Sequence, residues 1–305
     1  MVNITSKSNT LRKATAHAIV LVSKQETIDA VLNKTVPKGD VFEMAKAAGL
    51  LGVKKTSSLI PDCHPLPIEF TAVRYTIKDL EIHIEMEVHT IYKTGVEVEA
   101  MHGASVVALT MYDMLKPIDK GIQITTIKLL NKKGGKTDFR DKFLNRKDLN
   151  AAVIVCSDSI AAGQKEDKAG KAIIAKLNES QITIGAYKII PDEKEQIQNC
   201  VARFYQEKFS LLIFTGGTGL SSRDVTPESI EPLLDRRISG IEEAIRSYGQ
   251  NRTPYSMLSR SIAGVKGDML ILALPGSTNG AKESMDAIFP EVLHLFGILK
   301  GNRHD

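Results

Sequence analysis

The sequence predicts two domains of different fold class: an α+β domain, followed by an α/β domain with a doubly wound, three-layer arrangement. At 305 residues the chain is longer than one typical domain. In the first half, strand-like and helical patterns follow the order β-α-β-β-α-β, whereas the second half alternates strands and helices throughout. Between the halves lies a segment rich in charge, so we expect domains at residues 1–137 and 150–305 and a linker at 138–149.

The composition is that of an ordinary soluble protein, with 43% hydrophobic and 25% charged residues. No apolar run approaches the ~20 residues that a membrane-spanning helix needs. The net charge of +4 is mild, which argues against a general nucleic-acid binder but suits small anionic substrates. The three cysteines are far apart and form no CxxC pair, as is typical of reduced thiols in a cytoplasm. We therefore expect a cytoplasmic protein without nucleic-acid or membrane partners. An RNA-binding arm at residues 131–150 is the sharper alternative, but its aromatic residues are limited to Phe139 and Phe143.

The elements of the first half follow from periodicity and from end signals. Residues 80–89 alternate between apolar and polar side chains, which predicts a strand with one solvated face. Asp40 is suited to cap the helix that follows it, and Pro117 ends the longest helical pattern. We expect strands at 17–23, 68–77, 80–89 and 122–130, and helices at 26–32, 41–55 and 96–116. With its first helical stretch split in two, this order indicates a ferredoxin-like domain.

The elements of the second half are short apolar strands, each followed by a helical pattern. We expect strands at 151–156, 182–190, 211–214 and 269–274, and helices near 168–177, 193–207, 228–234 and 240–248 and at the end of the chain. This alternation predicts a parallel or mixed sheet with helices on both faces. Ligands of such sheets bind outside the carboxyl ends of the strands.

A dense glycine cluster, TGGTG at 215–219, follows the third of these strands. Its glycines let the backbone turn sharply and present N–H groups to an anion, although a plain tight turn is the alternative. Arg223 then offers a guanidinium for phosphate and Asp224 a carboxylate for Mg²⁺. Thr226 and Pro227 are typical of a helix start, as N-cap and first helical residue. The residues expected to bind a nucleotide or pterin are Thr215, Gly216, Gly217, Thr218, Gly219, Arg223 and Ser277.

Polar residues also follow the other strands of the second half. Asp192 comes after the second strand, and with Asp224 it offers two carboxylates for Mg²⁺ on nucleotide phosphates. Ser277 follows the last strand. Asp158 follows the first, where it either belongs to the site or forms an Asx turn. All of these positions lie at carboxyl ends, so one crevice would hold them.

TGGTG followed by RDVTPE at 223–228 resembles the signature of the molybdopterin adenylyltransferase family, of the MogA and MoaB type. The resemblance implies that AMP passes from ATP to molybdopterin and that pyrophosphate leaves, with ATP as co-substrate and Mg²⁺ as cofactor. A pterin- or nucleotide-binding scaffold that has lost catalysis is the alternative. Asp192, Asp224 and every glycine of the loop are present, which favours the enzyme.

Titratable side chains mark the helix expected at 96–116. Asp113 and Lys116 are three residues apart and share one face, either as an acid–base pair or as an exposed ion pair. Five motifs surround them in the first half: KGDVF at 38–42, CHPL at 63–66, KTGVEVEA at 93–100, ASVVALTMYDMLK at 104–116 and GGK at 134–136. In this order they resemble the cyclic pyranopterin monophosphate synthase family, the MoaC family.

This second resemblance implies conversion of cyclic dihydro-GTP to cyclic pyranopterin monophosphate with loss of pyrophosphate. Such a reaction needs acid–base groups to move protons and cations to hold phosphates. By match to the family, the catalytic residues are Lys38, Asp113 and Lys116. The expected substrate contacts are Asp62, Cys63, His64, Glu97, Val98, Glu99 and Lys136.

Two positions depart from the family pattern. Asn3 stands where an acid is usual, and Asp62 stands where an apolar residue is common, which changes the charge of the expected substrate loop. A metal or nucleophile site at Cys63 and His64 is a rival interpretation, but further ligands do not follow at metal spacing.

The first site is expected to be shared between chains of a homo-oligomer. Glu99 and Asp113 are 14 positions apart on one predicted helix, which corresponds to about 21 Å along its axis. One reacting atom cannot touch both, so either a long substrate spans them or a second subunit supplies one of them. Resemblance to a family that works as oligomers favours the second, with Gly103, Ala104 and Ser105 allowing helices of two chains to approach closely.

Overall fold

The computed structural model describes residues 1–135, 138 and 146–301. The chain forms two compact units, Met1–Arg140 and Asp141–Asp305, and their division lies within the charged segment at 138–149. Lys136, one of the expected substrate contacts, lies outside the described residues.

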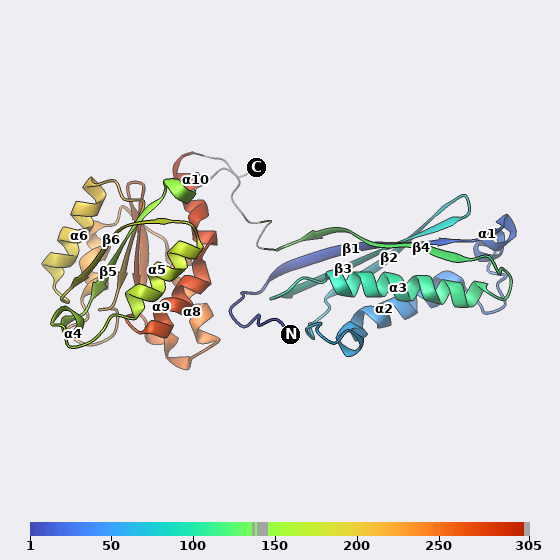
Figure 1. The fold of residues 1–305 in the computed structure, drawn as a ribbon, viewed down its shortest axis with the longest axis horizontal. Coiled ribbons are helices and arrows are strands. Elements are labelled where there is room, and N and C mark those ends of the chain that lie inside the picture. Colours follow the sequence, from blue (N-terminus) through green and yellow to red (C-terminus); the bar gives the residue numbers. More distant parts are fainter. Residues whose placement is uncertain (136–137, 139–145, 302–305) are drawn as a thin grey trace. The chain divides into compact units, whose positions relative to one another are not determined.

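The N-terminal unit is a four-stranded antiparallel sheet with two long helices, α2 and α3, packed on one face (Figure 1). Its strands lie in the order β2-β3-β1-β4. The elements are β1 (Thr10–Leu21), α1 (Gln25–Leu32), α2 (Val41–Leu59), β2 (Phe70–Lys78), β3 (Glu81–Tyr92), α3 (Glu97–Leu115) and β4 (Gln123–Lys133). This is the order expected from the sequence, with the first helical stretch divided into α1 and α2.

Local sequence explains why these elements form. In β3, alternate side chains point into the core against the helices: Ile82, Ile84, Met86 and Val88. Asp40 caps α2, since its Oδ1 accepts from the backbone N–H groups of Phe42 and Glu43 at 3.1 and 3.2 Å. The predicted cap and the predicted alternation are both confirmed.

Two strands are longer than apolar periodicity predicts. β1 begins at Thr10, well before the expected start at residue 17. β4 continues to Lys133, so Lys132 and Lys133 belong to the sheet and not to the charged connection. Pairing of Lys13 with Lys133 shows the reason. Hydrogen bonds along the ladder satisfy the backbone whatever the side chains are.

The C-terminal unit is a mixed sheet of six strands in the order β6-β5-β7-β10-β9-β8. The first four run parallel, and β9 and β8 are antiparallel additions at one edge. The strands are β5 (Asn150–Cys156), β6 (Thr183–Ile190), β7 (Leu211–Thr215), β8 (Arg236–Arg237), β9 (Ile262–Lys266) and β10 (Met269–Leu274). The α-helices are α4 (Asp158–Ala161), α5 (Ala169–Glu179), α6 (Lys194–Gln206), α7 (Thr226–Ile230), α8 (Ser239–Gln250), α9 (Thr278–Ile288) and α10 (Leu295–Leu299). Short 3₁₀ turns occur at Arg146–Asp148, Glu231–Leu233, Pro254–Leu258 and Glu291–His294.

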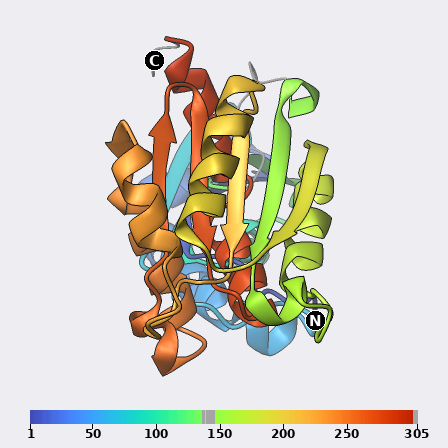
Figure 2. The ribbon, with the colours of Figure 1, turned by 90° about the vertical axis from the view of Figure 1, so that its left-hand side faces the viewer.

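Helices cover both faces of this sheet (Figure 2). Successive strand residues point to opposite cores: Ile213 packs in the core with α5 and α9, and Phe214 packs in the core with α6. The α/β class expected for the second half is therefore confirmed. β9 and β8 were not expected, because β9 is short and carries Gly264 in its middle, and β8 consists of two exposed arginines.

Among the described residues, no helix has the length and apolar character needed to cross a membrane.

Candidate active sites

The structure brings the three expected catalytic residues of the N-terminal unit together. Asp113 lies in the last turn of α3, and Lys38 lies in the loop before α2. Lys38 Nζ lies 2.6 Å from Asp113 Oδ2 and 2.9 Å from its backbone oxygen, while Lys116 Nζ lies 2.8 Å from Asp113 Oδ1. One carboxylate thus holds two ammonium groups at the end of the helix.

The two lysines determine the charge of this carboxylate. Hydrogen bonds from Lys116 and then from Lys38 lower the pKa of Asp113 to about 2. The same carboxylate raises the pKa of Lys116. All three side chains are well exposed to solvent, so the cluster is accessible to a substrate and contributes little to the stability of the fold.

A second cluster lies near the first turn of α3. Glu99 is buried, and the Cys63 thiol donates to its Oε1 at 3.0 Å. Burial raises the pKa of Glu99, and burial together with Glu99 raises the pKa of Cys63 to about 12. Cys63 is therefore a protonated donor at neutral pH, which argues against the interpretation of this residue as a nucleophile.

The remaining expected contacts lie around this second cluster. His64 Nε2 lies 2.8 Å from the backbone oxygen of Val2, and Asp62 pairs at 3.0 Å with the amino group of Met1. Asp62, which departs from the family pattern, thus holds the N-terminal amine. Val98 is 45% exposed on the outer side of α3.

A basic pocket of about 340 Å³ opens beside Glu97. Five cations line it, Lys7, Arg12, Lys93, Lys132 and Lys133, against the two carboxylates Glu97 and Asp138. Burial raises the pKa of Glu97. The 2.9 Å bond to Lys132, a backbone hydrogen bond and the charges of Lys132 and Arg12 together outweigh burial, so the pKa lies below the ordinary value. The pocket is suited to an anion with several charges.

These five cations were missed in the sequence. They come from the chain start, from the β3–α3 connection and from β4, so only the fold brings them together. The sequence shows only scattered basic residues at these positions, with no shared motif that could have joined them.

The two clusters lie at opposite ends of α3, as expected. Both Glu99 and Asp113 belong to this helix, which places them about 21 Å apart along its axis. Gly103 was expected to let helices of two chains approach each other closely, and this expectation is wrong. A side chain there would meet Val53 of α2 at 2.5 Å, so the small residue serves packing of α2 on α3 within one chain.

The glycine loop of the C-terminal unit follows β7, as expected. Gly216 and Gly217 have φ values of +102° and +60°, which suit glycine. A side chain at Gly216 would meet the Cys156 backbone oxygen at 2.1 Å. The N–H of Gly216 donates to Leu274, so this amide serves the fold rather than an anion.

A pocket of about 380 Å³ lies at the carboxyl ends of β5, β7 and β10. Its lining joins the two expected metal carboxylates, Asp192 and Asp224, with Thr215, Gly216 and Gly217 of the loop. Lysines at 165 and 168, which were not expected, line it as well. A crevice is therefore present at the strand ends, but of the positions expected in it, Asp158 and Ser277 are not among the residues that line it.

The carboxylates of this pocket fit a divalent cation. Asp192 Oδ1 is buried and has no hydrogen-bond partner within the described structure. Burial and then the neighbouring Asp158 and Asp224 raise the pKa of Asp192, and a cation would reverse this effect. Within the described residues, no group of three or more His, Cys, Asp or Glu side chains could hold a metal. A cation held by two carboxylates would complete its shell with phosphate oxygens and water, as Mg²⁺ commonly does.

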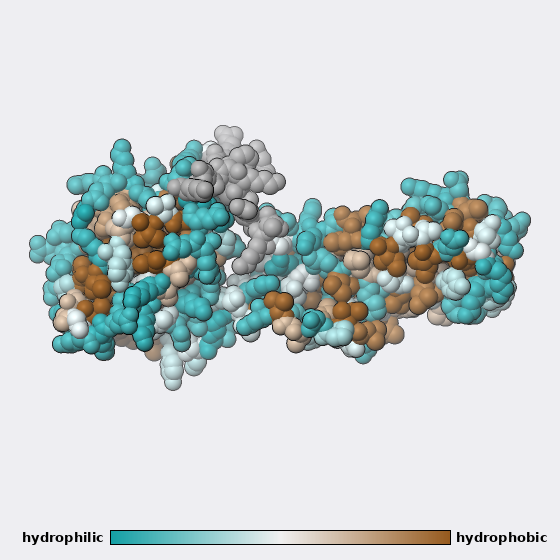
Figure 3. Space-filling view, viewed as in Figure 1, coloured by the Kyte–Doolittle hydropathy of each residue, from teal (hydrophilic) through white to brown (hydrophobic). Residues whose placement is uncertain are grey.

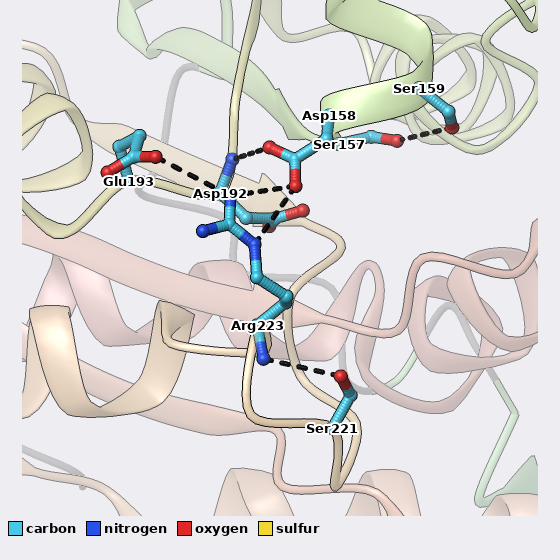
Figure 4. Close-up of polar contacts among 7 residues, drawn as sticks. All are labelled: Ser157, Asp158, Ser159, Asp192, Glu193, Ser221 and Arg223. Atoms are coloured by element: carbon cyan, nitrogen blue, oxygen red, sulfur yellow. Dashed lines mark hydrogen bonds and ion pairs between the residues drawn. The ribbon is translucent and has the colours of Figure 1, made fainter.

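Arg223 is held by carboxylates at the rim (Figure 4). Its Nη2 lies 2.8 Å from Asp158 Oδ2 and 3.4 Å from Glu193 Oε1. Asp158 Oδ1 also accepts from the backbone N–H of Asp192 at 3.1 Å. Asp158 therefore connects the glycine loop to the β6–α6 loop, a role beyond that of a local Asx turn.

The structure differs from the sequence-based expectation at the start of α7 and at Ser277. The cap of α7 is Val225, whose backbone oxygen accepts from the N–H of Ser229 at 3.0 Å, and Thr226 is the first residue of the helix. The N–H of Thr226 donates to the backbone oxygen of Gly217 at 3.1 Å. Ser277 caps α9 by accepting from Gly280 at 3.1 Å. It lines a neighbouring pocket of about 460 Å³ together with Ser259 and Tyr255, rather than the pocket of the carboxylates.

Comparison with known proteins gives each of the two units a family of its own. Residues 1–135 match the model of the MoaC family, and residues 152–294 match that of the probable molybdopterin binding domain. The chain is thus an enzyme of molybdenum cofactor biosynthesis that carries two domains of this pathway.

Individual relatives show which proteins of molybdenum cofactor biosynthesis the chain resembles. The molybdenum cofactor biosynthesis bifunctional protein of Chlorobaculum tepidum is 38% identical over 304 residues, which cover 100% of this chain and 96% of that protein. The cyclic pyranopterin monophosphate synthase of Syntrophomonas wolfei is 45% identical over 139 residues, 45% of this chain and 88% of its own. The solved structure of the molybdopterin biosynthesis enzyme MoaB from Thermus thermophilus is 37% identical, covers 50% of this chain and 97% of its own, and has a TM-score of 0.47. The chain belongs to the family of bifunctional molybdenum cofactor biosynthesis proteins.

Proposed function

We propose that the chain catalyses two reactions of this pathway. The N-terminal unit converts cyclic dihydro-GTP to cyclic pyranopterin monophosphate and pyrophosphate. The C-terminal unit transfers AMP from ATP to molybdopterin in the presence of Mg²⁺. The observation that carries the proposal is that each unit gathers its own carboxylates: Asp113 between two lysines in the first unit, and Asp192 with Asp224 beside the glycine loop in the second.

In the first reaction, Asp113 is the group that accepts and returns a proton. It is ionised at neutral pH, as an aspartate ordinarily is, and Lys116 and Lys38 lower its pKa further. These ammonium groups are proton donors within 3 Å of it. The five cations of the basic pocket balance the phosphates of the substrate and the departing pyrophosphate. Acid–base chemistry and phosphate binding thus fall to different clusters.

The separation of these clusters supports a site shared between subunits of a homo-oligomer. The exposed faces of α2 and α3 carry large apolar side chains, and Figure 3 shows apolar groups over these helices. Exposed members of this surface are Met44, Leu51, Val98 and Leu109. An apolar patch on a surface helix marks an interface. A second copy placed there would bring the basic pocket of one chain toward Asp113 of another.

A complementation experiment tests the shared site. Glu99→Ala and Asp113→Ala chains, each inactive alone, are unfolded, mixed in equal amounts, refolded and assayed. If each site takes Glu99 from one chain and Asp113 from another, about one quarter of the sites collect neither lesion, and activity returns to about that fraction. A mixture as inactive as its parents, with mixed oligomers shown by mass spectrometry, would assign both residues to one chain's site.

In the second reaction, a phosphate oxygen of molybdopterin attacks the α-phosphorus of ATP. The bond from that phosphorus to the bridging oxygen breaks, and pyrophosphate leaves. The protein positions the groups and balances charge, as is usual for transfer at phosphorus. Bound Mg²⁺ would supply positive charge beside the phosphate oxygens, held by Asp192 and Asp224. Lys165, Lys168 and Arg223 offer further positive charge to the phosphates.

A binding scaffold without catalysis is the second candidate for this unit. Arg223 is compatible with it, since its Nε and Nη2 are already engaged by Asp158 and Glu193 in this structure. An assay with ATP and molybdopterin, read as pyrophosphate release and as adenylylated molybdopterin, decides between the two. Binding of both substrates without either product would establish the scaffold.

Removal of Mg²⁺ should weaken ATP binding by about tenfold or more, or about 1.4 kcal/mol. The reason is that Asp192 and Asp224 would face the phosphates without an intervening cation. Calorimetric titration of ATP with Mg²⁺ and with EDTA measures the effect. The Asp192→Asn, Asp224→Asn double variant is the control and should lose most of the metal dependence. Equal ATP affinity with and without metal in the wild type would remove both aspartates from the metal role.

A further inference from the structure

Arg260 binds backbone oxygens at both ends of the turn from Gly219 to Asp224, which continues the glycine loop. It lies between the Pro254–Leu258 turn and β9, outside the motif that carries the loop. Its Nε donates to the oxygen of Gly219 at 2.7 Å and its Nη2 to the oxygen of Asp224 at 2.6 Å. Its own backbone N–H donates to the oxygen of Thr218 at 3.2 Å. The remaining Nη1 forms an ion pair with Glu228 in α7.

The positions it fixes are those that shape the carboxylate site. A side chain at Gly219 would come within 2.9 Å of Asp224 Oδ2, so the loop folds back until the Asp224 carboxylate lies against Gly219. Asp224 Oδ2 accepts from the N–H of Ser221 at 2.8 Å, which closes the turn between them. Arg260 therefore joins the peptide before this turn to the peptide that carries the metal carboxylate.

A guanidinium is suited to this task. Nε and Nη2 lie on one edge of a rigid plane and donate in parallel, so two carbonyl oxygens are held at a fixed separation. A lysine ammonium is a point charge and does not define that separation. The acceptors are backbone carbonyls, which cannot rotate away as a side chain can.

Arg223 provides the contrast within the same loop. Its partners are the exposed carboxylates of Asp158 and Glu193, which an incoming phosphate can replace. The side chain of Arg260 is engaged on both edges, and two of its partners are backbone oxygens, which a phosphate does not replace. Neither arginine is among the residues that line the carboxylate pocket. Arg223 is thus placed to meet the ligand and Arg260 to hold the loop.

We infer that Arg260 is a positioning residue, which sets the glycine loop and the Asp224 carboxylate in the geometry that binds Mg²⁺ and nucleotide. The inference rests on the proposed adenylyl transfer for its ligand, and on the loop contacts for its mechanism. Arg260 touches neither substrate nor metal and acts through Asp224.

Hydrogen exchange of the substrate-free full chain tests the mechanism directly. In Arg260→Ala and Arg260→Lys, amides of residues 216–225 should exchange about tenfold faster than in the wild type, because the loop opens more often. Amides of β7 and β10 should keep their protection. The matched control is Arg203→Ala, which removes an arginine paired with Glu207 on the surface of α6. It should leave the loop unchanged.

ATP binding supplies the second readout. The Mg²⁺ concentration for half-maximal ATP binding should rise about tenfold in both Arg260 variants, as expected when a charge-assisted hydrogen bond to a ligand-positioning group is lost. Added methylguanidinium should restore the wild-type value in Arg260→Ala and not in Arg260→Lys, whose longer side chain fills the space. A purely structural contact would not respond in this way.

Three outcomes of these experiments would contradict the positioning role of Arg260 or the proposed function. Slow loop exchange together with weak ATP binding would make Arg260 a direct ligand contact and overturn the inference. Faster exchange throughout the strands would make it a folding contact and overturn it as well. A wild-type chain that binds no ATP with Mg²⁺ would overturn the proposed function, while loop exchange in the same protein would still show whether Arg260 holds the loop.

Discussion

Replacement of Asp113 by Asn should lower the rate of pyranopterin formation by about 10²–10⁴-fold, the usual contribution of a general acid–base group. The amide keeps the shape of the side chain but cannot accept a proton from the substrate. Because Asp113 is exposed, the free energy of unfolding should change little, and thermal unfolding should remain near that of the wild type. AMP transfer by the C-terminal unit should be unchanged in the same sample.

The pH dependence gives a further check on Asp113. Lys116 and Lys38 lower its pKa to about 2, so the carboxylate stays ionised as the pH falls through the ordinary aspartate value of about 3.9. Its ion pairs are therefore present above that value and are lost only as the pH falls toward 2. The synthase rate should show no loss near the ordinary value that traces to this residue. Asp113→Asn that retains normal synthase activity would place proton transfer elsewhere.

The spacing of apolar residues in the sequence was sufficient to predict most of the helices and strands. β3 alternates cleanly since one face packs on helices and the other does not, and its period could be found without a structure. The outer ends of β1 and β4 could not be predicted from the sequence, because their side chains are polar. Only the pairing of the two strands around Lys13 and Lys133 defines these ends. β8 and β9 were not predicted for a related reason. Pairing at the edge of the sheet holds them, and their short sequences carry little periodic pattern.

Site residues were predictable where one short segment carries the chemistry. Asp113 and Lys116 lie one helical turn apart, and the glycine loop with Asp224 lies within a few residues. The basic pocket has no such segment, because Lys7 and Lys132 meet only after β1 and β4 have paired. Arg260 likewise lies far from the loop in sequence, and only its bonds to backbone oxygens reveal its role.

The two sites use carboxylates in opposite ways. Asp113 is exposed between two ammonium groups, so it is ionised without any ligand and ready to exchange a proton. Asp192 is partly buried beside other carboxylates, which raises its pKa, and a bound cation would favour its ionised form. Metal should therefore matter to the second reaction and be dispensable for proton transfer in the first.

Replacement of Asp224 by Asn should lower AMP transfer by about 10²–10³-fold, the usual loss when one charge-stabilising group is removed from a site. The amide can still accept from the N–H of Ser221, so the turn of the loop should persist. What is lost is one of two negative charges for Mg²⁺, and affinity for ATP with Mg²⁺ should fall with it. Synthase activity, which depends on a cluster in the other unit, should stay at the wild-type level.

Steady-state rates of both reactions, measured on one preparation of Asp224→Asn, provide the test. The control is Glu207→Gln, which removes a carboxylate charge at the end of α6, outside the carboxylate pocket and away from the contacts of Arg260. It should retain most of the AMP transfer rate. Loss of both reactions in folded Asp224→Asn would show that the sites depend on each other, contrary to two separable activities. Full AMP transfer in this variant would remove Asp224 from the metal site and leave Asp192 as its single carboxylate.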